Sequence, residues 1–478
     1  MSNTSISPIY EINTAVYLSK LSKNGRLLKL DQIPDSEIRR IADLGFKSVW
    51  LMGIWQRSPI ARTIALSNAG LMAEVGSVLP DFNAKDLIGS AYAIKNYMVN
   101  QQFGGETALA KLRNRLNDFK ISLILDFVPN HVAADHPWLK SNHDYFIYGK
   151  SNDLKNNPEE FINLNGDIYA FGRDPTYPPW NDVVQLNAFS TSYREQSITT
   201  LLEIAKMCDG VRCDMAMLLL NQIFESTWGV KAGTMPEIEY WQKVINQVKL
   251  NFPDFQFIAE AYWDTQSELL NLGFDYCYDK DLSDYLAEGS AKAVYKHLIK
   301  TMPIRDQLLT FIENHDELRS ASIFNYPKLF AAATVITMLP GATLIYDGQI
   351  EGNKTRVPVH LARGLAEQTD VLIQHFYQQL FEIVRNWQVE ESEMQIVDCN
   401  KSSVLAWRLV NQNFNHLVAV NYDGSKNTAL IKPSSDYNFD HQKELIDLFD
   451  PNFKPVFQED KQIMIEFKPW QIRLINLD

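Results

Sequence analysis

Short apolar runs alternate with longer amphipathic stretches from the N-terminus to about residue 350. Short β-branched or aromatic runs are typical of strands, and longer stretches with a helical apolar period are typical of helices, so the alternation predicts repeated βα units and a parallel sheet. Eight such strands suit a closed (β/α)8 TIM barrel. The predicted strands are AVYL (15–18), SVWLMG (48–53), ISLILDFV (121–128), DGVRCD (209–214), FQFIAE (255–260), FDYCY (274–278), LLTFIE (308–313) and ATLIY (342–346).

Helix signals lie between these strands. PDSEIRRIADLG (34–45) opens with Pro and Asp and closes with Gly, which are helix start and stop signals. ETALAKLRNRLNDF (106–119) has the same apolar period. A further helix is expected over about 370–386.

Two regions depart from the barrel pattern. The connection after the third strand is too long for a simple loop and is rich in Asn, Asp, Pro and Gly, which predicts a small excursion domain over 132–187. After about residue 390, short alternating runs separated by turn residues predict an all-β C-terminal domain. We therefore expect the barrel over 1–131 and 188–388, the excursion domain, and an antiparallel β-sandwich over 389–478.

Charge and the pattern of apolar runs limit the classes of binding partner that we expect. The chain has 45 Lys and Arg against 58 Asp and Glu, a formal charge of -13, and no basic run, so no nucleic acid partner is expected. The first residues lack a signal-peptide pattern, and no apolar stretch is long enough to span a membrane. We expect a cytoplasmic protein without a membrane partner, and the sequence leaves its oligomeric state open.

Polar residues gather where the predicted strands end, and in a βα barrel the reactive groups lie at these carboxyl ends. The fourth strand ends in Arg212 and Asp214, the fifth in Glu260, and the seventh runs into His315 and Asp316. A single carboxylate at a strand end is more often a cap or an ion-pair partner than a reactive group. Together they predict a cluster of acids at the mouth of the barrel.

Glycoside hydrolysis needs such a cluster, because anions stabilise its oxocarbenium-like transition state while one carboxyl group must donate a proton. Arg212 lies two residues before Asp214, so both side chains share one face of a strand and the guanidinium can keep Asp214 ionised as the nucleophile. Glu260 lies in the apolar run FIAEAYW, where burial favours a protonated acid. This reasoning predicts Asp214 as nucleophile and Glu260 as general acid/base.

The chain resembles the α-amylase family, glycoside hydrolase family 13. The resemblance is carried by DFVPNH (126–131), GVRCD (210–214), AE (259–260) and NHD (314–316), which follow one another in the family's order. It also covers GSAYAIKNY (89–97), WNDVVQLN (180–187) and PGATLIYDGQ (340–349).

Residue by residue, the resemblance implies a catalytic trio and a set of sugar-binding side chains. Asp214 forms the glycosyl-enzyme, Glu260 is the acid/base, and Asp316 holds sugar hydroxyls in the transition state. Four further residues serve substrate binding: Tyr92 stacks on the sugar at the cleavage point, His131 and His315 bind its hydroxyls, and Arg212 orients Asp214. The alternative is that each histidine is an ordinary hydrogen-bonded residue and Tyr92 a core residue.

The sequence departs from the family pattern at two places. Ala93 stands where exo-acting members often have Asp after the stacking Tyr, which puts a tight pocket for chain ends in doubt. MAML follows Asp214 where many members have a Lys-His pair that also serves a calcium site, whereas Asn130 does match a family calcium ligand. We expect no required cofactor, we assign no metal ligands, and we predict that calcium chelation leaves the thermal stability nearly unchanged.

The leading hypothesis is a retaining α-glycosidase that hydrolyses α-1,4-glucosidic bonds in glucans or maltooligosaccharides through a covalent glycosyl-enzyme. The first alternative is an α-glucan transglycosidase with the same nucleophile, because a sugar hydroxyl can replace water as the acceptor. A non-catalytic glucan-binding protein is the alternative from another class. The intact set of Asp214, Glu260 and Asp316 argues against it.

Overall fold

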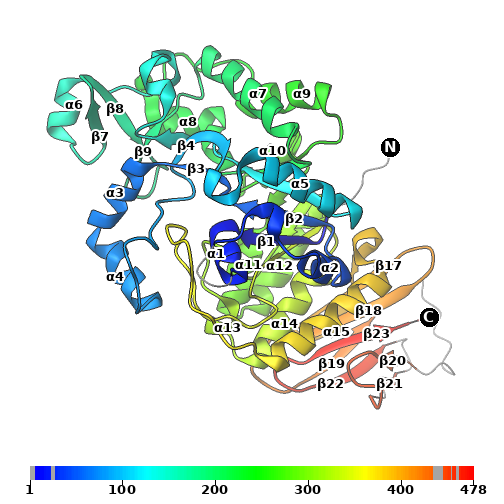
Figure 1. Ribbon diagram of the computed structural model, residues 1–478. Coiled ribbons are helices and arrows are strands. Elements are labelled where there is room, and N and C mark those ends of the chain that lie inside the picture. The colour runs from blue at the N-terminus through cyan, green and yellow to red at the C-terminus, as the bar shows by residue number, and fades with distance from the viewer. Residues whose placement is uncertain (1–5, 23–26, 434–444, 454, 459–461, 478) are drawn as a thin grey trace. The chain divides into compact units, whose positions relative to one another are not determined.

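The computed structural model of the chain describes residues 6–22, 27–433, 445–453, 455–458 and 462–477 (Figure 1). The chain divides into two compact units. The first contains Met1–Tyr278 and Arg356–Ala366, and the second contains Asp279–Thr355 and Glu367–Asp478. Each unit is described by itself.

Eight parallel strands form a closed barrel in the order β1-β14-β13-β12-β11-β10-β5-β2. Every residue of β1, β2, β10 and β14 is buried, which is the pattern of strands covered on both faces. The predicted TIM barrel is confirmed. The strands are β1 Ile9–Asn13, β2 Ser48–Met52, β5 Ser122–Phe127, β10 Gly210–Cys213, β11 Gln256–Ala259, β12 Tyr276–Tyr278, β13 Leu308–Thr310 and β14 Ala342–Tyr346.

The predicted first strand over 15–18 is wrong, because these residues belong to helix α1, Thr14–Leu21. Its buried residues, Thr14, Ala15, Tyr17 and Leu18, follow the helical period of a one-sided core contact. Asn13 caps the helix by accepting a hydrogen bond from the Val16 amide at 3.4 Å. The true strand β1 escaped prediction because the buried Glu11 interrupts its apolar run.

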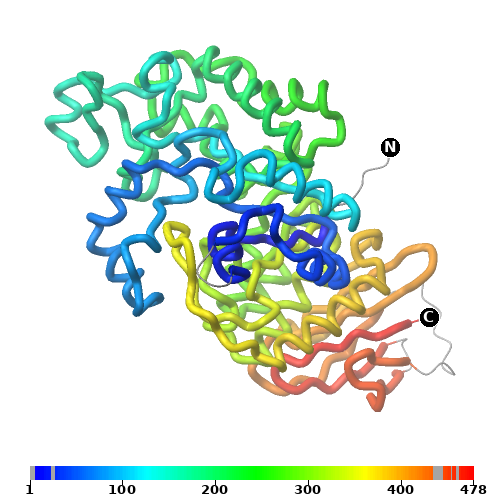
Figure 2. The backbone as a smooth tube through the Cα atoms, viewed as in Figure 1, coloured from blue at the N-terminus to red at the C-terminus, as the bar shows by residue number. Residues whose placement is uncertain are grey.

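The helices of the first unit include the two predicted over 34–45 and 106–119, which are α2 and α5. Gly45 after α2 has a φ of +94°, which suits the residue that stops a helix. Figure 2 shows α7 and α9 running side by side. The helices are α1, α2 Asp35–Asp43, α3 Pro59–Ser67, α4 Ala69–Val78, α5 Gly105–Asp118, α6 Ser151–Asn156, α7 Thr191–Ala205, α8 Asn221–Trp228, α9 Tyr240–Asn251 and α10 Gln266–Asn271.

The long connection after β5 contains a sheet of its own, with strand order β6-β9-β8-β7. Its strands are antiparallel, and Asn165 and Gly166 form the tight turn between β7 and β8 with positive φ angles of 56° and 102°. A separate pair, β3 Trp55–Arg57 and β4 Ile94–Val99, is also antiparallel. The excursion after the third barrel strand is therefore present, and its domain bounds remain a prediction. Its strands are β6 His131–Ala133, β7 Phe161–Leu164, β8 Asp167–Gly172 and β9 Trp180–Gln185.

The helices of the second unit include the one predicted over about 370–386, which is α15. Its N-cap Asp370 accepts hydrogen bonds from the amides of Leu372 and Ile373. The helices are α11 Lys280–Glu288, α12 Ala291–Thr301, α13 Ser320–Ile323, α14 Tyr326–Thr337 and α15 Val371–Trp387.

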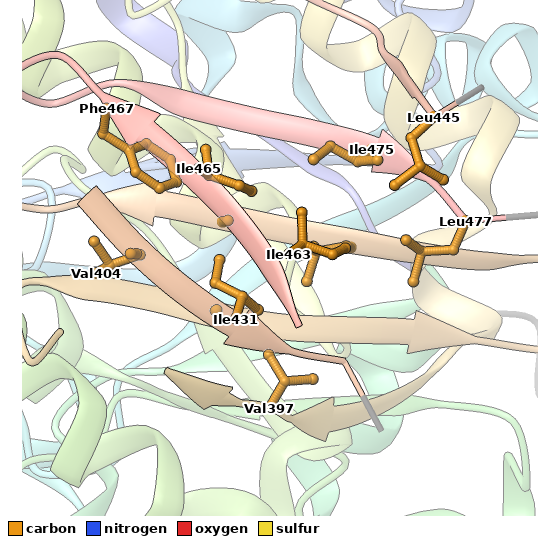
Figure 3. Packing of buried hydrophobic residues seen from close by; sticks show 13 residues of the cluster. Val397, Val404, Ile431, Leu445, Ile463, Ile465, Phe467, Ile475 and Leu477 are labelled. Carbon is orange, nitrogen blue, oxygen red and sulfur yellow. The ribbon is translucent and has the colours of Figure 1, made fainter. Parts of the chain in front are cut away.

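The second unit ends in two antiparallel sheets, with strand orders β15-β17-β18-β23-β20 and β16-β19-β22-β21. Val404 and Ile475 of the first sheet share a buried core with Ile431, Ile463 and Phe467 of the second (Figure 3). This packing of two sheets confirms the predicted all-β C-terminal region. The strands are β15 Glu393–Ile396, β16 Asp398–Cys399, β17 Val404–Val410, β18 Asn415–Asn421, β19 Asn427–Lys432, β20 Ile446–Asp447, β21 Val456–Phe457, β22 Ile463–Phe467 and β23 Ile472–Asn476.

Candidate active site

Asp214 and Glu260 leave two neighbouring barrel strands at the same level. Cys213 of β10 pairs with Ala259 of β11 in parallel register, and the next residue of each strand is one of the two acids. The amide of Glu260 donates to the Cys213 carbonyl at 3.1 Å, and that of Asp214 donates to the Phe127 carbonyl at 2.8 Å. The backbone therefore fixes both carboxyl groups at the carboxyl ends of adjacent strands.

One guanidinium contacts both acids. Nη1 of Arg212 lies 2.7 Å from Oδ1 of Asp214, and Nη2 lies 2.8 Å from Oε2 of Glu260. All three side chains are buried, with exposed fractions of 1%, 8% and 4% for Arg212, Asp214 and Glu260. The predicted contact between Arg212 and Asp214 is present, and the contact with Glu260 was not predicted.

Aromatic rings enclose the Arg212 side chain. The guanidinium carbon lies 5.3 Å from the ring centres of Trp50 and Tyr92 and 5.7 Å from that of Tyr278, whose hydroxyl also accepts a hydrogen bond from Nε at 3.3 Å. Burial alone would lower the pKa of Arg212, but Glu260 and, with a smaller effect, Asp214 raise it well above its ordinary value. Arg212 is therefore a fixed positive charge between the two acids.

Glu260 accepts hydrogen bonds at both of its oxygens. Oε2 accepts from the amide of Met215 at 2.6 Å as well as from Arg212, and Oε1 accepts from the hydroxyl of Tyr262 at 2.8 Å. Met215 has a φ of 45°, a left-handed conformation that is rare outside glycine and is found where a site requires it. Because two N–H donors occupy Oε2, Oε1 is the oxygen at which a transferable proton can reside.

Sequence reasoning missed Tyr262, although it lies only two residues after Glu260. The residues that follow it, Trp263 and Asp264, have φ angles of 58° and 60°. The carbonyl of Tyr262 accepts a hydrogen bond from the Thr265 hydroxyl at 2.6 Å. This tight turn holds the phenol against Glu260, and no periodic pattern in the sequence signals it.

Tyr92 and His131 lie near this cluster in the first unit. Tyr92 is half-buried against Arg212, and a hydrogen bond joins the His131 side chain to the backbone of Tyr92. Burial lowers the pKa of His131 to about 4, which outweighs the opposite effect of that hydrogen bond. Its ring centre lies 5.1 Å from that of Trp180. A neutral imidazole of this kind can exchange hydrogen bonds with a sugar hydroxyl.

Asp126, the first residue of the DFVPNH motif, has a structural role. Its carboxylate accepts hydrogen bonds from the Trp50 indole at 3.2 Å and the Gly53 amide at 2.9 Å, and its carbonyl accepts from the Trp55 indole at 2.8 Å. These bonds tie the ends of β2 and β5 together. Asp126 therefore supports Trp50, which packs on Arg212.

His315 and Asp316 lie in the second unit, on the loop after β13. The strand ends at Thr310, earlier than the predicted 308–313. Nε2 of His315 lies 3.0 Å from Oδ2 of Asp316, and the Asp316 side chain is 46% exposed while that of His315 is buried. The Asp316 amide donates to Oδ1 of Asn314 at 2.9 Å. The two residues are thus held as a pair whose carboxylate is accessible, and their sugar-binding roles remain predictions.

Within the described ranges, no three or more His, Cys, Asp or Glu side chains gather in a way that could hold a metal ion. No helix in the part of the chain that the structure describes has the length and apolar character to cross a bilayer.

The family model described as the alpha amylase catalytic domain matches residues 35–403. The match covers most of the chain and includes Tyr92, His131, Arg212, Asp214, Glu260, His315 and Asp316. This protein belongs to the alpha-amylase family of glycoside hydrolases.

Individual relatives agree with this assignment. The chain is 23% identical over 297 residues to Alpha-amylase 3 of Dictyoglomus thermophilum, a match that covers 57% of this chain and 56% of that protein. It is 19% identical over 376 residues to Maltase A1 of Drosophila melanogaster, covering 66% and 60% of the two chains. The chain spans about half the length of the curated relatives it matches.

Solved structures share the fold over nearly the whole chain. The alpha-amylase of Geobacillus thermoleovorans, complexed with acarbose, has a TM-score of 0.70 at 18% identity, covering 99% of this chain and 98% of that one. The trehalose-6-phosphate hydrolase of Bacillus licheniformis also has a TM-score of 0.70, at 15% identity, covering 98% and 99%. At such identities the likeness concerns the fold alone.

Proposed function

We propose that this protein hydrolyses α-1,4-glucosidic bonds in glucans or maltooligosaccharides with retention of anomeric configuration. The observation that carries the proposal is the contact of one guanidinium, that of Arg212, with both Asp214 and Glu260. An oxygen of each acid lies within hydrogen-bond distance of the same planar group. This favours the carboxyl spacing of retaining glycosidases, about 5 to 5.5 Å, over the about 6.5 to 9.5 Å of inverting enzymes.

In the first half-reaction, Asp214 attacks the anomeric carbon while Glu260 gives its proton to the leaving glycosidic oxygen. The bond from the anomeric carbon to that oxygen breaks and an ester to Asp214 forms. Arg212 keeps Asp214 in the ionised form that attack requires, since its positive charge lies 2.7 Å away. Burial of the three side chains strengthens these charge interactions.

In the second half-reaction, Glu260 takes a proton from water, whose oxygen displaces Asp214 from the anomeric carbon. Two displacements at one carbon return the α configuration. We assign both transfers to Oε1 of Glu260, because Oε2 accepts from the N–H groups of Arg212 and Met215, whereas Oε1 faces the hydroxyl of Tyr262, which can also accept a hydrogen bond. A transglycosidase shares the first step and differs in the acceptor alone.

The choice of substrate rests on the family and its members. The matched relatives are named for amylase and maltase activities, and the Geobacillus thermoleovorans structure was obtained with acarbose. The proposal extends to Tyr92 as a stacking platform and to His131, His315 and Asp316 as ligands of sugar hydroxyls. The roles of His315 and Asp316 rest on the NHD motif alone.

Trapping of the glycosyl-enzyme tests this proposal. Glu260→Gln treated with α-glucosyl fluoride should accumulate a glucosyl adduct, because fluoride leaves without an acid while the second step lacks its base. Peptide mapping should find the added mass on the peptide that carries Asp214. Glu203→Gln, which alters an exposed carboxylate of α7, is the matched control and should accumulate no adduct. An adduct on another residue, or release of the β anomer by the wild type, would contradict the proposal.

A further inference from the structure

The side-chain amide of Gln185 lies at the centre of three carbonyl oxygens. Its Nε2 lies within hydrogen-bond distance of the backbone carbonyl of Asn130 at 2.9 Å, of Oδ1 of Asn130 at 2.9 Å and of the carbonyl of Leu186 at 3.0 Å, and these three acceptors share its two N–H bonds. Gln185 and Asn130 are 0% and 1% exposed. Such convergence of buried oxygens on one point is the arrangement that a cation would otherwise require.

Strand pairing brings these groups together. Gln185 is the last residue of β9 and pairs with His131 of β6, which directly follows Asn130. The oxygen of the Gln185 amide is also engaged, since Oε1 accepts from the Arg173 amide at 3.3 Å and from Nδ2 of Asn130 at 3.4 Å. Both ends of this buried amide are therefore satisfied by neutral partners.

Asn130 stands where the family resemblance places a calcium ligand, so the fit of a calcium ion can be tested on this geometry. Calcium needs six to eight oxygens at about 2.3 to 2.6 Å, and carboxylates supply most of its affinity. Here the oxygens surround a nitrogen at hydrogen-bond distance, and the cluster contains no carboxylate. A calcium ion and the Gln185 amide cannot share this space, so the residues present do not fit the ion.

Two acids of the excursion, Asp174 and Asp167, could in principle supply a carboxylate, but both have other roles. Oδ1 of Asp174 accepts the amides of Thr176 and Tyr177 at 2.6 and 2.8 Å and so forms a turn. Asp167 lies 3.6 Å from His143 with half of its side chain exposed. In the part of the chain that the structure describes, neither carboxylate forms a hydrogen bond with Asn130 or Gln185, so neither supplies the missing charge.

We propose that the amide nitrogen of Gln185 takes the place of a cation in this chain and joins the excursion sheet to the end of β5 without metal. The neutral amide of Gln185 donates hydrogen bonds to the Asn130 and Leu186 carbonyls, which a bound ion would otherwise coordinate. The protein should therefore hold its structure in the absence of calcium.

Thermal unfolding of the full chain with EDTA and with calcium chloride tests this proposal. The wild-type melting temperature should be the same in both buffers, and calcium titration should release no binding heat. In Gln185→Asp the side chain is one methylene shorter and carries a carboxylate in place of the amide. The position of the amide nitrogen is then empty, and the carboxylate lies opposite the oxygens of Asn130 and Leu186. Its melting temperature should fall by several degrees in EDTA and recover with calcium.

Gln349→Asp is the matched control, because Gln349 is equally buried and donates to the Tyr377 hydroxyl at 2.8 Å. It should lose stability without any recovery in calcium. A wild-type melting temperature that falls in EDTA would overturn the proposal, as would Gln185→Asp without calcium-specific recovery. If Gln185→Asp does not fold, calcium titration of the wild type decides: binding heat with a melting temperature raised by calcium would overturn the proposal, and the absence of both supports it.

Discussion

The guanidinium of Arg212 lies 2.7 Å from the carboxylate of Asp214, two residues further along the chain, and both are buried at the end of β10. The same guanidinium reaches Glu260 on the neighbouring strand. A charge shared in this way holds one acid ionised for attack and fixes the position of the other. Arg212 is therefore the residue whose loss should disturb both acids at once.

Arg212→Lys should lower kcat about 100-fold or more, because an ammonium group cannot contact both acids in the planar geometry of arginine. The free energy of unfolding should fall by about 3 kcal/mol, since one buried carboxylate loses its partner. Steady-state kinetics and urea unfolding measure the two effects. Arg305→Lys is the matched control: Arg305 is also buried and pairs with Asp279 at 2.7 Å, so this change should reduce stability and leave kcat near the wild-type value. A wild-type kcat in Arg212→Lys would contradict the role given to this residue.

Tyr262→Phe should move the alkaline limb of the kcat/KM profile to higher pH. The hydroxyl donates to Oε1 of Glu260 at 2.8 Å and so favours its charged form, whereas the acid step needs the proton to stay on Glu260. A pH series with a maltooligosaccharide measures the shift. Tyr422→Phe, which removes a hydroxyl bonded to the Leu286 carbonyl at 2.8 Å, should leave the profile in place. Superimposable profiles for Tyr262→Phe and the wild type would show that the hydroxyl has no part in the acid step.

Asp126→Asn and Asp214→Asn should separate a structural carboxylate from a catalytic one. In Asp126→Asn the new amide group faces the indole of Trp50 or the amide of Gly53, so a buried donor loses its acceptor. The free energy of unfolding should fall by about 1 to 3 kcal/mol while kcat changes less than about 10-fold. Asp214→Asn should abolish turnover, and it should also lower the free energy of unfolding because the buried Arg212 loses one of its two acidic partners. Turnover that is lost in Asp126→Asn and retained in Asp214→Asn would contradict the proposed role of Asp214.

Stability should fall as the pH drops from 6.5 to about 4, partly because of His131. Its folded pKa is about 4 against an ordinary value of 6.5, so in this window the unfolded chain binds a proton that the native protein excludes. This difference in the pKa of His131 between the folded and unfolded states corresponds to about 3 kcal/mol in the free energy of unfolding. The buried side chain of His136, with a pKa of about 3, and the partly buried side chain of His360, with a pKa of about 4, act in the same direction. Urea unfolding across this window should show a smaller slope in His131→Gln, and an unchanged slope would contradict the burial effect.

Seven of the eight barrel strands and the C-terminal sheets could be predicted, because their apolar runs are continuous or alternate strictly. The first strand could not be predicted from apolarity, since Glu11 lies buried in its middle. The contact of Arg212 with Asp214 followed from a spacing of two on one strand. Its second contact, with Glu260, depends on the register between β10 and β11, which a single sequence does not contain.

Other site features depend on backbone conformation or on distant pairing. Tyr262 reaches Glu260 through a turn with positive φ at Trp263 and Asp264, a conformation that is rare for a bulky residue such as Trp263. The amide of Gln185 meets Asn130 only because β6 and β9 pair across more than fifty residues of intervening chain. Hydrophobic periodicity does not signal contacts of either kind.

Product analysis with maltoheptaose tests the central claim most directly. Wild-type protein and Asp214→Asn are followed side by side by chromatography and by NMR of the anomeric protons. The account predicts shorter oligosaccharides released in the α configuration by the wild type and none by the variant. Products longer than maltoheptaose would identify a transglycosidase, and release of the β anomer, or equal activity in Asp214→Asn, would contradict the account.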